Sequence, residues 1–385
     1  MFICEEEKTN KKKVAILGAS YLQLPLIFKA KDNGIEVHCF AWDNEKAVCK
    51  NHADFFYDIS VLDKENILKK CKEIKIDGIL TIATDICIPT ISYISNKLNL
   101  IGNSEFCAEV TTNKVKMREL FNSKGVLCPK TIKVNNLDSI SEKELNFPLI
   151  VKPSDRSGSL GVEKVYNKKD LLLAMNEAIE VSFKKECIVE EFVEGVEISV
   201  EVISYKGKHK VITITDKIVT GSPYFVELEH HQPSMLDSKI QNKIHKIAIK
   251  ILELSKVQNG ASHIEFKIDK ENEIYLIEIG TRMGGDFIGS DLVNLSTGFD
   301  YLDAVLKVSI GQFTFPEIIE STKFSGVYFV CDQTKRLSKY FSIDTDSNLK
   351  HIIRKEKTNK ELVLAKNSND RSGYIIYQAS SKLIL

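Results

Sequence analysis

The chain has 385 residues, enough for two or three domains with a substantial core. Lysine plus arginine and aspartate plus glutamate number 53 each, so net charge gives no reason to expect a nucleic acid or an anionic membrane as partner. The first residues lack the apolar core of a signal peptide, no apolar run is long enough for a bilayer, and the nine cysteines form no CxxC. We therefore expect a cytoplasmic protein with reduced thiols.

A βαβ pattern opens the chain. Strands are expected over 13–20 (KVAILGAS), 35–43 (IEVHCFAWD) and 76–83 (IDGILTIA), with helices between them. The dinucleotide fingerprint GxGxxG is missing, since only Gly18 is present, so specific NAD binding is not expected. Thr84 and Asp85 follow the third strand, where ligands bind in open α/β sheets; a simple helix cap is the alternative.

The middle of the chain places a lysine beside a loop of small residues. After a capped helix beyond residue 107, the strand LIVK ends in Lys152, and the loop SDRSGSLGV follows Pro153. Backbone amides of such a loop can approach phosphate oxygens closely. The P-loop signature is absent. An unliganded Gly/Ser turn is the alternative.

Two strand-like segments further on, ASHIEFKID and EIYLIEI, are joined by the polar turn KENE. If Asp269 pairs with Ile274, the antiparallel register sets Glu265 opposite Glu278. Facing carboxylates destabilise a sheet, and a divalent cation bound by their oxygens would offset the repulsion. A register shifted by one residue, or two acids facing solvent, is the alternative.

Taken in order, these stretches resemble the ATP-grasp superfamily. The order is Lys114, VKP with Lys152, the SGSLGV loop, EEFVEGVE, and the paired acids followed by Arg282. The resemblance covers most of the chain and is closest to the carboxylate–amine ligase branch, of biotin carboxylase/carbamoyl-phosphate synthase type. It implies an α/β and α+β fold. A Rossmann-like pre-ATP-grasp domain (1–106) precedes a two-part ATP-grasp domain (107–312) and a small β-rich C-terminal domain (313–385).

The resemblance also implies how ATP and a metal would be held. The lysines contact phosphates, the loop from 157 to 161 closes over the triphosphate, segment 190–193 meets adenine, and Glu197 binds the ribose hydroxyls. The expected ATP-binding residues are Lys114, Lys152, Ser157, Gly158, Ser159, Gly161, Glu190, Glu191, Phe192, Val193 and Glu197. Glu265 and Glu278 match the magnesium carboxylates, and Mn²⁺ is a second ion that such a site accepts.

Three positions are expected to take part in catalysis. Arg282 matches a basic residue that contacts the acyl substrate or the transferring phosphoryl group, and His263 matches a basic residue near the acyl phosphate. Asp286, or one of the histidines 230 and 231, would accept the proton of an attacking amine; an ordinary buried side chain is the alternative for either histidine. Gly280 departs from the family pattern, which has Asn there, so one oxygen ligand of a second magnesium is missing from that position.

The implied function is an ATP- and Mg²⁺-dependent ligase. It would activate a small-molecule carboxylate as an acyl phosphate and transfer it to an amine, forming ADP and a C–N bond. No nucleic acid or membrane partner is expected, and a homodimer is left open. A bicarbonate-activating, carboxylase-like enzyme is one alternative, based on Asp286. A non-catalytic ATP-binding protein is another, based on Gly280.

Overall fold

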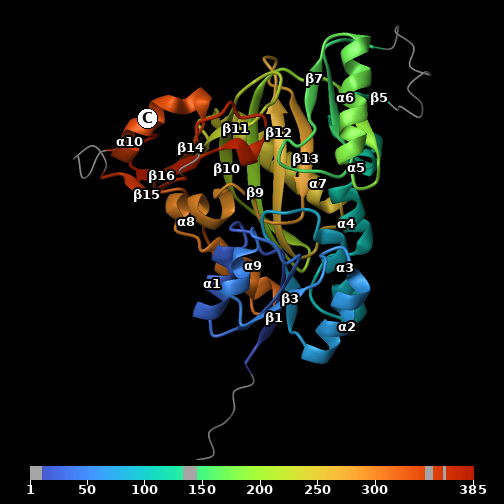
Figure 1. Ribbon diagram of the computed structural model, residues 1–385, viewed down its shortest axis with the longest axis vertical. Coiled ribbons are helices and arrows are strands. Elements are labelled where there is room, and N and C mark those ends of the chain that lie inside the picture. Colours follow the sequence, from blue (N-terminus) through green and yellow to red (C-terminus); the bar gives the residue numbers. More distant parts are fainter. Residues whose placement is uncertain (1–10, 133–144, 343–349, 359–360) are drawn as a thin grey trace, which may run out of the picture.

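The computed structural model describes residues 11–132, 145–342, 350–358 and 361–385, which are organised around three sheets (Figure 1). A large central sheet lies between the N-terminal sheet at one end of the molecule and a small sheet at the other. Within the described residues, no helix is long and apolar enough to cross a membrane. Their cysteines are free thiols, all buried except Cys187, as expected.

The N-terminal sheet is parallel, with strand order β3-β2-β1-β4. Its strands are β1 (Lys13–Leu17), β2 (Glu36–Ala41), β3 (Phe55–Asp58) and β4 (Gly78–Leu80), and its helices are α1 (Leu24–Asp32), α2 (Lys64–Ile74) and α3 (Ile88–Leu98). The near-continuous apolar runs of β1 and β2 follow from burial of both faces of a parallel sheet. The expected Rossmann-like opening is confirmed. Strand β3 was not expected, because its residues are half exposed and its pattern is weak.

A helix from much later in the chain packs against this sheet. Residues of α9 (Tyr301–Ser309) share one apolar core with β1 and α1, and the same core reaches Ile203 of the central sheet. The Tyr301 hydroxyl donates to the Val202 carbonyl at 2.8 Å. The N-terminal sheet is thereby fixed to the central sheet through buried side chains.

The small sheet is antiparallel, with order β5-β8-β6-β7. It consists of β5 (Thr131–Ile132), β6 (Leu149–Pro153), β7 (Glu163–Val165) and β8 (Cys187–Glu191). Helix α6 (Lys168–Val181) supplies Leu171, Ala174 and Ala178 to a separate core on this sheet. Helices α4 (Glu105–Thr112) and α5 (Lys114–Ser123) connect it to the N-terminal sheet.

The central sheet has eight antiparallel strands in the order β13-β12-β9-β10-β11-β14-β16-β15. The bounds of the first five are β9 (Val196–Tyr205), β10 (Lys208–Val219), β11 (Glu227–Gln232), β12 (Gly260–Ile268) and β13 (Ile274–Gly280). Helix α7 (Ser238–Leu254) buries Ile244, Ala248 and Ile251 against this sheet. After β13 come a π-helical turn (Ile288–Leu292) and α8 (Val293–Thr297).

The C-terminal strands extend the central sheet. They are β14 (Phe324–Val330), β15 (Ile352–Lys357) and β16 (Gly373–Ala379), with α10 (Lys339–Ser342) beside them. Because β14 pairs with β11, these described strands continue the sheet of the preceding segment. The division at 106/107 and 312/313 stays a prediction.

The register of the β12–β13 hairpin differs from expectation at its turn. The pairing of Asp269 with Ile274 is wrong by one residue, because Ile268 pairs with Ile274. A β-bulge further along corrects the offset: Phe266 faces Leu276, and Glu265 nevertheless faces Glu278, so Ile277 is the extra residue. The carbonyl of Ile277 accepts a hydrogen bond from Arg118 Nη2 at 2.7 Å. The two acids therefore face each other because of the bulge, which the regular two-residue alternation of side chains along a strand does not predict.

Candidate active site

A cavity of about 160 Å³ is lined by residues of both the small and the central sheet. It brings together most of the residues expected from sequence, namely Lys114, Lys152, Ser157, Gly158, Ser159, Glu190, Glu191, Phe192, Val193, Glu197, His263, Glu265, Glu278 and Arg282. Gly161 and Asp286 are not among the lining residues. Gly161 packs inward, since a Cβ there would lie 2.7 Å from Val181 Cγ2.

The lysine at the end of β6 belongs to a buried charge cluster. Lys152 Nζ lies 2.7 Å from Glu190 Oε2, and Arg118 Nε lies 2.6 Å from Glu190 Oε1. Burial raises the pKa of Glu190, but the charges of Arg118 and Lys152 outweigh it and lower that pKa to about 2. Glu190 therefore stays ionised and fixes Lys152 at the cavity wall, while its own side chain is fully committed.

The second predicted lysine holds one of the paired acids. Asn113 caps α5 by accepting from the Lys116 N–H, which starts the helix at Lys114. Lys114 Nζ donates to Glu278 Oε1 at 2.9 Å and to the Arg156 carbonyl at 2.7 Å. The lysine thus ties the paired acids to the loop that follows β6.

The other paired acid lies between two buried basic groups. Lys217 Nζ is 2.6 Å from Glu265 Oε1, and His263 Nε2 is 3.1 Å from the same oxygen. Burial raises the pKa of Glu265, but Lys217 and His263 lower it well below its ordinary value. Burial lowers the pKa of His263, and the carboxylates of Glu201 and Glu265 raise it above 6.5. Glu201, the His263 ring and Glu265 therefore form a continuous row of hydrogen-bonded polar groups that reaches the cavity.

Glu201 holds the His263 ring from the side opposite Glu265. It is fully buried on β9, hydrogen-bonds to His263 Nδ1, and accepts from the Gly284 N–H at 3.1 Å. A Cβ on residue 284 would lie 2.5 Å from Glu201 Oε1 and 2.8 Å from His263 Nδ1. Gly284 is therefore required by these two side chains.

At the other end of the cavity, polar and aromatic groups alternate. Lys267 Nζ lies 3.1 Å from Glu197 Oε1 and donates to the Val193 carbonyl at 3.2 Å. The rings of Phe192 and Phe225 approach to 5.7 Å between centroids. Apolar faces beside a fixed carboxylate and a strand end suit a planar base with an attached sugar.

The small-residue loop after β6 has the backbone conformation that glycine favours. Gly158 has a φ of +70° and Ser159 a φ of +56°. The Ser159 hydroxyl donates to the Phe225 carbonyl at 3.2 Å across the cavity mouth. Ser157 and Gly158 are exposed, and both line the cavity together with Ser159.

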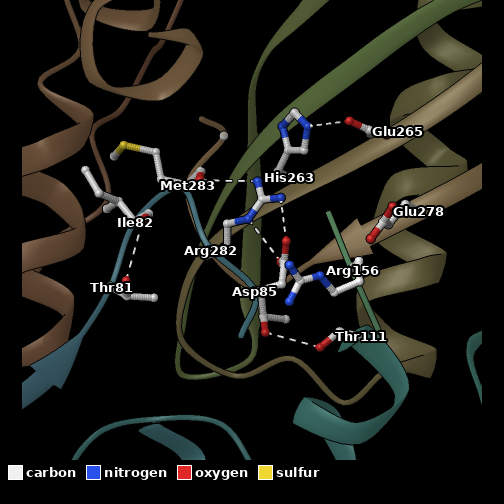
Figure 2. A network of polar contacts seen from close by, with 12 residues as sticks. Thr81, Ile82, Asp85, Thr111, Arg156, His263, Glu265, Glu278, Arg282 and Met283 are labelled. Atoms are coloured by element: carbon white, nitrogen blue, oxygen red, sulfur yellow. Dashed lines mark hydrogen bonds and ion pairs between the residues drawn. The ribbon is translucent and has the colours of Figure 1, made fainter. Parts of the chain in front are cut away.

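The predicted catalytic arginine forms a two-pronged ion pair with the N-terminal segment. Arg282 Nε and Nη2 donate to Asp85 Oδ1 and Oδ2 at 3.0 and 2.8 Å (Figure 2). Asp85 follows the strand expected over 76–83, so its placement beside a ligand cavity agrees with the position of ligands in open α/β sheets. The helix-cap alternative is wrong, since α3 has no side-chain cap.

The predicted proton acceptors lie elsewhere. Arg371 Nη1 and Nη2 donate to Asp286 Oδ2 and Oδ1 at 2.7 and 2.8 Å. His231 is bonded to Tyr377 and Glu229, and His230 Nε2 lies 3.9 Å from Asp286. Among the described residues, none of these three predicted acceptors lines the cavity. The basis for Asp286 as base, and for the bicarbonate alternative that rested on it, is thereby weakened.

The paired acids can provide two of the ligands of a metal ion, but not a complete set. The described residues contain no group of three or more His, Cys, Asp or Glu side chains suited to hold an ion by themselves. Mg²⁺ is commonly bound by one or two carboxylates together with substrate phosphates and water. Glu265 and Glu278 face each other in the cavity and carry only lone-pair acceptors, so they can supply that protein share.

Several residues that line the cavity or hold its side chains were not expected from sequence: Arg118, Glu201, Lys217 and Lys267. Each acts through a partner distant in sequence, such as Arg118 and Glu190, which are 72 positions apart. Arg118 lies beside Met117 and Phe121 on the buried face of its helix, in KMRELF. A charged residue in such a position indicates a buried ion pair, so the sequence did hold a signal for Arg118.

Comparisons with known proteins identify a domain family and a fold. Residues 145–291 match the family model of the ATP-grasp domain. Alanine–anticapsin ligase from Bacillus subtilis is 30% identical over 286 residues, which are 65% of this chain and 60% of that protein. The chain thus spans less than two thirds of the length of this relative.

Solved structures match over nearly the whole chain. The L-amino acid ligase from Bacillus licheniformis superposes with a TM-score of 0.79 at 21% identity, covering 96% of this chain and 94% of that one. Phosphoribosylglycinamide synthetase from Anaerococcus prevotii gives 0.74 at 24% identity, covering 97% and 95%. The fold is that of the ATP-grasp enzymes. Within that fold, residues 145–291 are the part that matches the ATP-grasp domain model.

Proposed function

We propose that this protein is an ATP- and Mg²⁺-dependent ligase that activates a carboxylate as an acyl phosphate and joins it to an amine. The observation that supports this best is the facing pair Glu265 and Glu278 in a cavity that also holds Lys114 and Lys152. Paired acceptors and paired cations in one cavity suit a polyphosphate with its counter-ion.

ATP would lie along the length of the cavity. Segment 190–193 and the ring of Phe192 would receive the base, Glu197 the ribose hydroxyls, and Lys114 and Lys152 the phosphates. The loop Ser157–Ser159 would close over the triphosphate through its backbone N–H groups, excluding water from the reacting atoms. Glu265 and Glu278 would hold Mg²⁺, which when bound neutralises charge on the phosphates.

The reaction would take two displacements. A substrate carboxylate oxygen forms a bond to the γ-phosphorus of ATP, and the bond from that phosphorus to the bridging oxygen of ADP breaks. The amine nitrogen then forms a bond to the acyl carbon, and the bond from that carbon to the phosphate oxygen breaks. The proton that the nitrogen loses passes to the leaving phosphate, so the step balances without a protein base. Arg282 and His263, which both line the cavity, would orient and stabilise the negative oxygens of the acyl phosphate.

The substrates are proposed to be amino acids or similar small acids and amines. The names of two similar proteins, an alanine–anticapsin ligase and an L-amino acid ligase, support this class. The bicarbonate alternative is based on Asp286. This residue is bound by both terminal nitrogens of Arg371 and does not line the cavity. Carboxylic acids are therefore the favoured substrates.

A screen for ADP formation dependent on both an acid and an amine tests the proposal. ADP release should require Mg²⁺ and one of each from a panel of amino acids, and the product should carry a new amide bond by mass spectrometry. Release with bicarbonate alone would support the carboxylase alternative. ATP binding without ADP release across the panel would support a non-catalytic protein.

The nucleotide site has a separate test. Lys152→Ala removes a positive charge from the phosphate region while Glu190 keeps Arg118 as partner. Calorimetry with a non-hydrolysable ATP analogue should show weaker binding, and the exposed control Lys130→Ala should bind like the wild type. Unchanged affinity in Lys152→Ala would refute this placement of the phosphates.

A further inference from the structure

The position at which the family pattern has Asn is occupied by a side chain from another part of the chain. A Cβ on residue 280 would lie 2.3 Å from Asp85 Oδ1 and 3.2 Å from Arg282 Nε. Contacts under about 3 Å are not compatible with real Cβ atoms, so any side chain at 280 would displace Asp85. Gly280 and Asp85 therefore share one volume beside the reacting centre.

The loop that carries Asp85 is firmly seated. The Ala83 N–H donates to the Met283 carbonyl at 3.1 Å, and Gln23 Nε2 donates to the Ile82 carbonyl at 2.7 Å. Ala83 takes a φ of +60°, a conformation that residues other than glycine adopt only when their surroundings enforce it. The docked loop brings a carboxylate from the N-terminal segment into contact with the arginine that follows β13.

The ion pair leaves part of the guanidinium available to the cavity. Arg282 uses Nε and Nη2 on Asp85 and Nη1 on the Met283 carbonyl at 3.3 Å. Arginine has five N–H groups, and for the rest no acceptor lies among the described residues. Figure 2 shows the guanidinium between the side chains of Asp85 and His263. The side chains of Asp85 and Arg282 are 13% and 11% exposed, so the pair is largely shielded from water.

We propose that Asp85 is the positioning residue for Arg282, and that Gly280 is present so that its carboxylate can reach the guanidinium. A two-pronged carboxylate fixes the plane of the guanidinium, which a single acceptor does not. The aligned N–H groups then face the place where the acyl phosphate forms. The N-terminal segment thus completes the site. This inference rests on the proposed function, because it assigns Arg282 to the reacting centre.

The first experiment changes the charge of Asp85 and keeps its shape. Asp85→Asn should lower kcat for the acid and amine pair about tenfold or more, the scale of one lost charge-assisted contact. KM for ATP should stay within about twofold, because Asp85 does not line the nucleotide cavity. Asp300→Asn is the matched control, since Asp300 also pairs with the N-terminal segment, through Lys29 at 2.7 Å, and Asn preserves its helix cap. Wild-type kcat in Asp85→Asn, or an equal loss in Asp300→Asn, would overturn the proposal.

The second experiment tests whether residues 85 and 280 act as one unit. Gly280→Ala should lower kcat as much as Asp85→Ala, because the added methyl group displaces the carboxylate. The double variant should be no worse than either single variant, since both remove the same contact. Additive losses would show that the two positions act independently and would overturn the proposal.

A third measurement needs no acid or amine, so it separates failure of this inference from failure of the proposed function. ADP, Mg²⁺ and fluoroaluminate together mimic a transferring phosphoryl group. Calorimetry should show that fluoroaluminate tightens ADP binding in the wild type and in Asp300→Asn, and about tenfold less in Asp85→Asn. Equal tightening in wild type and Asp85→Asn, including none in both, would refute the positioning role whatever the substrate screen finds.

Discussion

Two largely buried arginine–aspartate pairs hold the loop after β13 at its two ends, and they have different surroundings. At one end Arg282 reaches out to Asp85, and at the other Asp286 is reached by Arg371. Both pairs are two-pronged, with N–O distances between 2.7 and 3.0 Å. Arg282 lines the cavity, whereas Asp286 does not.

The difference lies in what each guanidinium does beyond its carboxylate. Arg371 also donates to the carbonyls of Ser368 and Glu227, and lies 3.8 Å from the centroid of the Phe329 ring. Its donors are used within the fold. Arg282 keeps donors facing the cavity. The same pair of residue types is therefore expected to stabilise the fold at one end of the loop and to serve chemistry at the other.

The largest effect is expected from breaking the C-terminal pair. Arg371→Met leaves Asp286 buried without its main partner, which should lower the free energy of unfolding by on the order of 3–5 kcal/mol. Urea unfolding of Arg371→Met measures this loss. The control is Arg336→Met, which removes a half-exposed arginine paired with Glu229 and should cost no more than about 1 kcal/mol. Equal losses in the two variants would contradict a structural role for the buried pair.

A smaller effect, on catalysis, is expected at the other end of the loop. Arg282→Lys keeps the positive charge but loses the planar group that holds two oxygens at once. Product formation at saturating substrates should fall about tenfold or more, equivalent to about 1.4 kcal/mol, with ATP affinity nearly intact. Steady-state kinetics and calorimetry provide both values. Wild-type turnover would remove Arg282 from the reacting centre.

The pH dependence of the free energy of unfolding tests the cavity end of the loop, because His263 lines the cavity there. Burial lowers its pKa, but Glu201 and Glu265 raise it above the unfolded value of 6.5. Its contribution to stability is therefore complete below pH 6.5 and is lost as the pH rises through its folded pKa. The gap in unfolding free energy between wild type and His263→Gln should narrow from pH of about 6 to about 9. A gap that widens over this range would contradict a charged His263.

The smallest effect is expected from testing Asp286 as a base. Burial raises the pKa of this carboxyl, but Arg371 and His230 lower it far below its ordinary value. A carboxyl group that stays ionised over the pH range of the assay produces no pH dependence of kcat. Asp286→Asn should therefore leave the acidic limb of the pH profile of kcat in place, whatever it does to stability. Disappearance of that limb would restore Asp286 as the proton acceptor.

Much of this architecture could be predicted from sequence, because its signals are local. Apolar runs broken by helical segments predicted the parallel N-terminal sheet, and a polar turn between two β-rich stretches predicted the β12–β13 hairpin. The facing of Glu265 and Glu278 was predicted from a register that is one residue off. A bulge at Ile277 restored the outcome, and its stabilising contact comes from Arg118, far from the hairpin in sequence.

The partners of the functional side chains could not be predicted, because they are set by tertiary packing. Asp85 and Arg282 are 197 positions apart, and no periodicity links them. The lack of a side chain at Gly284 is likewise required by Glu201 and His263, which are distant from it in sequence. Charged pairs of this kind are formed by the fold. A single sequence therefore shows which charged residues are present, but not which of them pair.

The way the C-terminal strands join the central sheet has a consequence for any attempt to shorten the protein. Strand β11 bonds on one side to β10 and on the other to β14, where Glu229 faces Tyr328 and Gln232 faces Ser325. A chain ending before β14 would leave a row of unpaired backbone N–H and C=O groups along β11. Such an edge is a template for pairing with another chain. Deletion of the last strands would thus produce a self-associating species, so the segment that carries the cavity is not expected to be stable as a separate protein.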